Sequence, residues 1–149
     1  MSARPPRPRT KSFQMPDRPG WRMLLGDLEA DIMEYFWSRP GHDWVAGRDV
    51  WNALSPARRS AYTTVTTVMA NLAQKGLLTV DKSAMTHHYK AVVEREEFTR
   101  QRVDQIVDRL LTNFPEQAMA RFVKATRAAP QPMRKELTRL IAQQLLEEG

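Results

Sequence analysis

The 149-residue sequence contains no cysteine. Disulfide bonds, thiolate catalysis and cysteine metal sites are therefore excluded for this chain. A protein without disulfides suits a reducing compartment, so we expect a cytoplasmic location. His87 and His88 do not form a metal pair, because adjacent residues of a strand point to opposite faces and no carboxylate lies beside them at a ligand spacing. We expect no metal and no other cofactor.

Long apolar segments are also missing. No run approaches the ~18 residues that a membrane-spanning helix needs. The basic N-terminal residues are not followed by the apolar core of a secretory signal. Nucleophile-elbow, phosphate-loop, zinc-ligand and paired-carboxylate motifs are absent as well. The sequence thus predicts neither a membrane protein nor an enzyme.

Helical periodicity is clearest in residues 61–78, the segment AYTTVTTVMANLAQKGLL. Its apolar residues follow the i, i+3, i+4, i+7 spacing of one buried helix face. They are Val65, Val68, Met69 and Leu72. The opposite face is polar, short-chained and almost uncharged. It carries Thr63, Thr67, Ala70 and Gln74, with Thr66 and Asn71 on its flanks.

Four threonines within five residues are costly in a helix, because a β-branched side chain loses rotamer freedom against the preceding turn. Such a face fits the major groove of DNA, where threonine can hydrogen-bond base edges or pack its methyl group on a thymine methyl group. The alternative is a solvated helix whose threonines bond back to carbonyl groups of the preceding turn. We expect Thr63 and Thr67 to contact base edges. Thr64, Thr66 and Asn71 would contact bases or the sugar-phosphate backbone.

The charge distribution supports a polyanionic partner. The formal net charge is +6 and the pI is about 10.1. Residues 58–90 carry five basic residues against Asp81, a net of +4, whereas residues 23–57 carry a net of −4. Phosphate contacts are expected from Arg58, Arg59, Lys75, Lys82, His87 and Lys90. Tyr62 either packs at the edge of the helix or meets a phosphate, and the two arginines are otherwise solvated charges.

Residues 1–22 form a separate segment, with five prolines in the first 20 residues and a net charge of +5. We expect a disordered basic arm. It is either a solvated tail or an arm that follows phosphates or enters a minor groove, which would add salt-dependent affinity.

Two further helices are expected before the threonine-rich one. Residues 26–38 have one apolar face and end at Pro40-Gly41. A short linker with His42 and Trp44 leads to a second, short helix at residues 49–54. Ser60 is the expected N-cap of the threonine-rich helix, and Gly76 is its C-cap glycine.

After Gly76 the apolar period changes from 3.6 to 2, which predicts strands at residues 77–82 and 87–93 joined by residues 83–86. Three helices followed by a hairpin are typical of a winged helix-turn-helix. The expected fold is therefore mostly α-helical with a small β-hairpin. Residues 23–93 would form a winged helix-turn-helix DNA-binding domain.

Residues 94–149 carry apolar stripes of helical spacing, interrupted near Pro115 and Pro130. These helices are too few to enclose a core, so we expect them to pair with the same helices of a second chain. The expected dimerisation residues are Phe98, Ile106, Leu110, Met119, Phe122, Leu137, Leu140, Ile141 and Leu145.

Four segments resemble the penicillinase-repressor family, the BlaI/MecI-like winged-helix repressors of bacteria. They are LGDLEADIMEYFW (residues 25–37), DVWNAL (49–54), AYTTVTTVMANLAQKGLL (61–78) and HHYKAVV (87–93). The resemblance covers residues 24–93 well and the rest in pattern only. It implies a homodimer that binds a pseudo-palindromic operator and blocks transcription. The recognition helix would be residues 61–75 and the dimerisation helices residues 95–148.

The resemblance also implies possibilities for induction. Antibiotic-responsive members are inactivated by proteolysis, commonly at an Asn-Phe bond, which implies a sensor-protease partner. The matching bond here is Arg121–Phe122, so the phenylalanine is kept and the asparagine is not. Copper-responsive members carry a cysteine cluster, which this chain lacks. Relatives usually carry an arginine at the position of Asn71, so one phosphate contact is missing or moved.

The sequence therefore predicts a homodimeric, sequence-specific DNA-binding regulator, acting as a repressor in the cytoplasm and at the nucleoid when bound to DNA. One alternative is a winged helix that serves protein–protein contacts or RNA binding. Another is a regulator that responds to a small ligand and is not inactivated by proteolysis.

Overall fold

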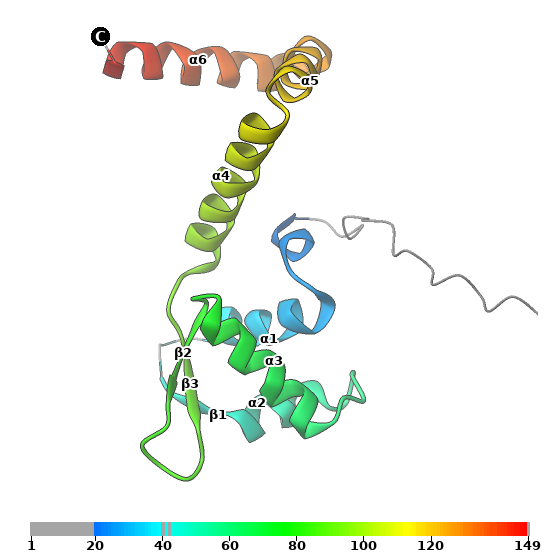
Figure 1. Ribbon diagram of the computed structural model, residues 1–149, viewed down its shortest axis with the longest axis vertical. Coiled ribbons are helices and arrows are strands. Elements are labelled where there is room, and N and C mark those ends of the chain that lie inside the picture. Colours follow the sequence, from blue (N-terminus) through cyan, green and yellow to red (C-terminus); the bar gives the residue numbers. More distant parts are fainter. Residues whose placement is uncertain (1–19, 40, 42, 149) are drawn as a thin grey trace, which may run out of the picture. The chain divides into compact units, whose positions relative to one another are not determined.

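Figure 1 shows the computed structural model of the chain, which describes residues 20–39, 41 and 43–148. The chain divides into two compact units, one up to Gln101 and one from Arg102 onward. In the first unit the described elements are η1 (Gly20–Leu24), α1 (Asp27–Ser38), β1 (Val45–Ala46), α2 (Gly47–Leu54), α3 (Tyr62–Gln74), β2 (Leu78–Asp81), β3 (His88–Ala91) and the beginning of α4 (Arg95–Asn113). The order of helices and hairpin confirms the predicted winged-helix fold class.

The core of the first unit lies where the apolar faces of the helices meet the sheet. Its fully buried members include Ile32 and Met33 of α1, Val50 of α2, and Met69 and Leu72 of α3. Burying side chains of this size contributes roughly 1.5–3 kcal/mol each. The apolar face predicted for the threonine-rich helix is thus confirmed as the packed face, and its polar face is left outside.

The sheet has three antiparallel strands in the order β1-β3-β2. Tyr89 of β3 lies opposite Val80 of β2 on one side and opposite Val45 of β1 on the other. The predicted hairpin is confirmed, but its strands are shorter than expected, and His87 belongs to the connecting loop. The expected linker around Trp44 was also wrong in part, because Val45 and Ala46 pair with β3 and α2 then begins at Gly47.

The first described residues are ordered, contrary to the expectation of an arm that extends to residue 22. Gly20–Leu24 form the 3₁₀ helix η1. The rings of Trp21 and Trp37 meet edge to face with centroids 4.9 Å apart, and Arg22 pairs with Asp31 and Glu34 of α1. These contacts hold residues 20–22 on the winged helix. The rest of the expected arm, residues 1–19, and His42 lie outside the described residues.

The second unit consists of the end of α4, then α5 (Pro115–Ala128) and α6 (Gln131–Glu148). Pro115 occupies the first turn of α5, where a missing N–H group costs nothing. From Arg102 onward, none of the described residues is buried. Many large apolar side chains are exposed there, among them Leu110, Phe122, Leu140, Ile141 and Leu145. Of the helices described, none has the length and apolar character needed to cross a membrane.

Candidate DNA-binding surface

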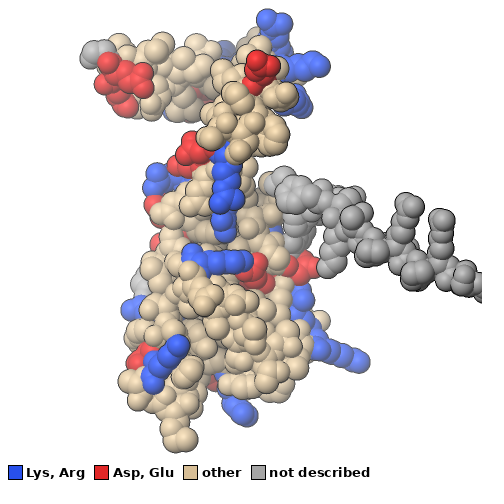
Figure 2. Space-filling view, in the orientation of Figure 1, with Lys and Arg blue, Asp and Glu red and all other residues tan. Residues whose placement is uncertain are grey.

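The exposed side of α3 is a strip of short, uncharged side chains, which we call the recognition face. Its residues are Thr63, Thr64, Thr67, Ala70, Asn71 and Gln74, and all are exposed. Figure 2 shows a broad uncharged area over α3, with Lys and Arg side chains at its margins. Because no long side chain stands in front of the helix, its backbone can approach a binding partner closely.

The two ends of α3 are fixed differently from each other. The expected cap at Ser60 was wrong: Ala61 occupies the N-cap position without a side-chain hydrogen bond, and the Ser60 carbonyl oxygen accepts from Trp51 Nε1 at 2.9 Å. At the other end Gly76 takes a φ of +83°. The Gly76 and Leu77 N–H groups donate to the carbonyls of Ala73 and Leu72, which closes the helix in a Schellman motif.

The threonine hydroxyls partly bond back to the helix. Thr67 Oγ1 donates to the Thr63 carbonyl oxygen at 2.7 Å, and Thr66 Oγ1 donates to the same oxygen at 3.1 Å. This is the back-bonding foreseen for a solvated helix. It commits the hydroxyl protons but leaves the Thr67 methyl group and oxygen lone pairs exposed. Thr66 is half-buried, and its methyl group lies against the start of α2 at Gly47.

Two cations expected to contact phosphate are held by carboxylates of α1. Arg58 Nε lies 2.8 Å from Asp31 Oδ2, and Lys75 Nζ lies 2.7 Å from Glu29 Oε2. Partial burial raises the pKa of Asp31, but hydrogen bonds from Arg22 and Arg58 outweigh this effect and lower the pKa below its ordinary value. Asp31 therefore stays charged. The Arg58 pair fastens the α2–α3 connection to α1, and the Lys75 pair fastens the C-terminal end of α3 to α1.

The hairpin β2–β3 with its loop, residues 78–91, is the wing. Its loop is turned by Asp81, whose Oδ1 accepts the Ser83 N–H at 2.9 Å; hydrogen bonds from Ser83 lower the pKa of Asp81. Lys82 and His87 are exposed on this loop, whereas Lys90 is half-buried with its Nζ 5.9 Å from the centroid of the Trp44 ring. Across the described residues, no three metal-ligating side chains cluster around either wing histidine.

Two residues beside the recognition face, Arg48 and Met85, carry no signal in the sequence. The Arg48 guanidinium lies over the Tyr62 ring, 5.6 Å from its centroid, at the N-terminal end of α3. Met85 is fully exposed in the wing loop. No spacing in the sequence relates Arg48 to Tyr62, since only the folded turn between α2 and α3 brings them together. An isolated loop methionine carries no periodic signal either.

The surface between α3 and the wing is concave. One hollow of about 280 Å³ lies beside Tyr62, Thr86 and His87, and a second of about 380 Å³ lies beside Gln74, Lys82 and His87. Tyr89 lines both. The structure therefore brings residues from both ends of α3 together with Lys82 and His87 of the wing around one trough, while Arg58 and Lys75 are engaged with α1.

The second unit carries most of the residues expected to dimerise. Leu110, Met119, Phe122, Leu140, Ile141 and Leu145 are exposed, and Ile106 and Leu137 are half-buried. Phe98 differs, because it is 5% exposed and its ring lies 5.5 Å from that of Trp37 in the core of the first unit.

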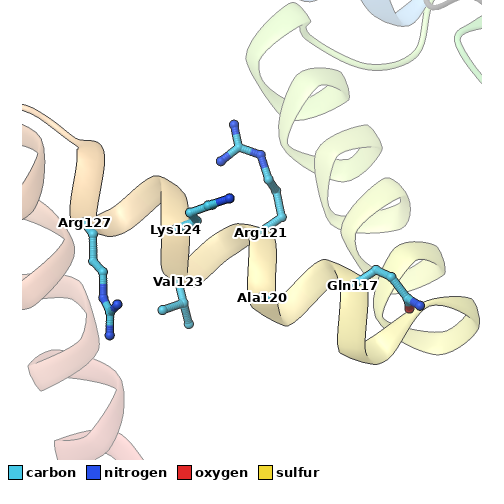
Figure 3. A pocket seen from close by; sticks show the side chains of 6 residues that line it. All are labelled: Gln117, Ala120, Arg121, Val123, Lys124 and Arg127. Atoms are coloured by element: carbon cyan, nitrogen blue, oxygen red, sulfur yellow. The ribbon is translucent and has the colours of Figure 1, made fainter.

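Helix α5 also borders a hollow of about 460 Å³, where Arg121 and Lys124 point to the same side of the helix (Figure 3). The Arg121–Phe122 bond lies inside α5, with both residues exposed.

Comparison with known proteins places these features in a family. A family model described as "Penicillinase repressor" matches residues 25–143. Two proteins named "Transcriptional regulator BlaI", from the CDC 1551 / Oshkosh and ATCC 25618 / H37Rv strains of Mycobacterium tuberculosis, are each 44% identical to the chain over 73 residues. The match covers 49% of this chain and 51% of each relative, so the chain spans about half the length of these curated relatives. Both relatives carry the name of a regulator and not of an enzyme.

Proposed function

Since this chain belongs to the penicillinase repressor family, we propose that it is a DNA-binding transcriptional regulator that represses genes as a homodimer on a pseudo-palindromic operator. Each subunit would place α3 in a major groove, and the second units would set the distance between half-sites. Repression would follow from occupation of promoter DNA, without any chemical reaction.

The observation that carries this proposal is the recognition face of α3. All of its residues are exposed and uncharged, and none has a side chain longer than that of glutamine. Such a surface has no evident use as a core face, and a solvated face would gain from charged residues with higher helix propensity. A helix with this surface can lie deep in a major groove and contact base edges. The neighbouring wing supplies the exposed side chains of Lys82 and His87 for the phosphates alongside.

The proposed roles follow from exposure and existing partners. Thr63 and Thr67 contact base edges, and Thr64 and Asn71 contact bases or the backbone at the edges of the face. Arg59, Lys82 and His87 contact phosphates, since all three are exposed. The remaining expected contacts are assigned a positioning role, because each already has an intramolecular contact. They are Arg58, Thr66, Lys75 and Lys90, whereas Tyr62 at the N-terminal end of α3 would meet a phosphate.

Homodimerisation is proposed from the second unit. In a monomer, the exposed leucines, isoleucine and phenylalanines on its helices would remain in contact with water. Removing apolar surface from water gains a free energy of roughly 25 cal/mol for each Å². The same helices of a second chain would cover them symmetrically. We leave Phe98 out of this interface because its own chain already buries it.

Induction stays a prediction. Cleavage between Arg121 and Phe122 would require α5 to unwind locally, because a protease binds extended backbone and this bond lies within the helix. A role of residues 1–19 in phosphate binding likewise stays a prediction.

Selection of bound duplexes from a random pool tests the proposed function. The full chain should enrich an inverted repeat whose half-sites face the same side of the duplex, roughly one or more helical turns apart. Genome-wide mapping of bound DNA should then find this repeat in promoters. Retention of duplexes without any enriched sequence would contradict a specific regulator, and enrichment of a single half-site would contradict the symmetric dimer.

A further inference from the structure

The smaller hollow of the trough lies between the N-terminal end of α3 and the wing. Gly47, Tyr62, Thr86, His87 and Tyr89 are among the residues that line it. Its volume of about 280 Å³ would hold a small polar group. Among the described residues that line it there is no carboxylate. An anion could therefore enter without meeting a like charge on its walls.

Tyr89 gives this hollow a hydrogen-bond donor. The residue is only 5% exposed, and its hydroxyl has no hydrogen-bond partner among the described residues. Among the described residues, every side-chain nitrogen or oxygen that is shut off from solvent has a hydrogen-bond partner. The Tyr89 hydroxyl is therefore not sealed inside the protein and opens to the hollow. Burial, with a smaller effect of nearby Tyr62, raises the pKa of Tyr89. The phenol thus keeps its proton at neutral pH.

The side chains of Tyr62 and Arg48 also lie at this hollow. A Cβ atom at Gly47 would lie 3.8 Å from Tyr62 Oη and 3.7 Å from Tyr89 Cε2, so both tyrosines border the position that this glycine leaves open. The Arg48 guanidinium stands over the Tyr62 ring at the rim. The hollow therefore combines two phenol groups with an adjacent permanent cation, which is a suitable set for a phosphate oxygen.

We infer that this hollow binds one backbone phosphate of the DNA, with Tyr89 and Tyr62 as hydroxyl donors and Arg48 as the cation. The inference rests on the proposed function. If α3 occupies a major groove and the wing reaches the next minor groove, the strand between the two grooves passes between α3 and the wing. A phosphate contact there fixes the position of the protein on the duplex but carries no sequence information.

Tyr89→Phe removes the hydroxyl and keeps the ring that packs beside β1 and β2. Its affinity should fall about tenfold on the selected duplex and by the same factor on random duplex, because a phosphate is present in both. The matched control is Tyr35→Phe on α1, whose hydroxyl accepts from Arg39 outside the hollow. It should bind like the wild type. Unchanged binding by Tyr89→Phe, or a loss confined to the selected duplex, would overturn the inference.

Neutral phosphate analogues in the DNA supply a second test, which locates the contacted phosphate. Single methylphosphonates placed along the selected duplex should identify one position per half-site where the wild type loses about tenfold in affinity and Tyr89→Phe loses much less. Arg48→Gln should lower the log–log salt slope by about 0.9 per subunit. Equal losses for wild type and Tyr89→Phe at every phosphate would contradict the inference. A wild type that binds no duplex at all would instead contradict the proposed function.

Discussion

At the residue scale, the back-bonded threonines limit how α3 can recognise a base. The Thr67 hydroxyl proton is committed to the Thr63 carbonyl oxygen, so the side chain can offer only an acceptor oxygen and a methyl group. The fitting partners in the major groove are the amino groups of adenine or cytosine and the methyl group of thymine. Guanine presents acceptors at its edge and would not be bound by this hydroxyl.

Substitutions at Thr67 separate the contact of its hydroxyl oxygen from the contact of its methyl group. Thr67→Ala should cost roughly 1–3 kcal/mol of binding free energy on the selected site and much less on random DNA. Thr67→Val keeps the methyl group and Thr67→Ser keeps the hydroxyl, so one of them should retain most of the affinity. Titrations followed by fluorescence anisotropy measure all three variants. Equal losses of Thr67→Ala on both duplexes would rule out a base contact.

Asp31 is the residue on which the ion pairs between η1, α1 and Arg58 converge. Its pKa is lower in the folded chain than the ordinary value of 3.8, so its contribution to stability is present at neutral pH. As the pH falls through 3.8 toward the lower folded pKa, the carboxylate is protonated and that contribution is lost.

Asp31→Asn should therefore lower the free energy of unfolding by roughly 1–2 kcal/mol at pH 7. The difference from wild type should shrink below about pH 4. Urea unfolding at several pH values measures this, with exposed Asp43→Asn as the control. A difference that stays constant down to the acid range would contradict the assigned ion pairs.

At the element scale, periodicity predicted the helices around the core and the hairpin, because their apolar faces alone determine them. It could not predict β1, since two residues show no alternation and their partner strand lies more than 40 positions away. The exact ends of the helices also depend on contacts with other parts of the fold. Ser60 was expected to cap α3, yet its carbonyl group serves Trp51 instead. Arg58 and Lys75 were expected to contact phosphate, and their α1 carboxylate partners are tertiary neighbours that no local pattern reveals.

Gly76 is an element-scale feature that the sequence did indicate. Its φ of +83° lies in the left-handed region, where a Cβ atom is strained. Gly76→Ala should lower the free energy of unfolding by roughly 1–2 kcal/mol while leaving the identity of the bound sequence unchanged. Gly76→Asn is the comparison, because asparagine tolerates the left-handed region better than alanine and should lose less stability. Equal melting temperatures for Gly76→Ala and wild type would show that the Schellman closure of α3 contributes little.

At the scale of the whole molecule, the two units differ in how they are stabilised. The first unit encloses a core, whereas none of the described residues from Arg102 onward is buried. In the proposed homodimer, a second chain would cover the apolar side chains of α5 and α6 and would also supply the second recognition face of a palindromic site. Dimerisation and DNA binding would then be coupled through the symmetry of the proposed dimer.

Leu140→Asp tests this coupling, since it would place a carboxylate in the proposed apolar interface. Sedimentation should show a dissociation constant raised by two or more orders of magnitude, about 3 kcal/mol, with the winged helix still folded. Leu146→Asp makes the same exchange on the same helix, on the side away from Leu140 and Ile141, and should remain dimeric. A dimeric Leu140→Asp variant would place the interface elsewhere.

The recognition face of α3 is tested most directly by the ratio of affinities for selected and random duplex. We predict that the wild type binds both at low ionic strength and prefers the selected duplex by several orders of magnitude. The double variant Thr63→Ala/Thr67→Ala should keep the weak binding to random duplex and lose most of the preference. A wild type indifferent to double-stranded DNA of any sequence, or a double variant with an unchanged preference, would contradict the account.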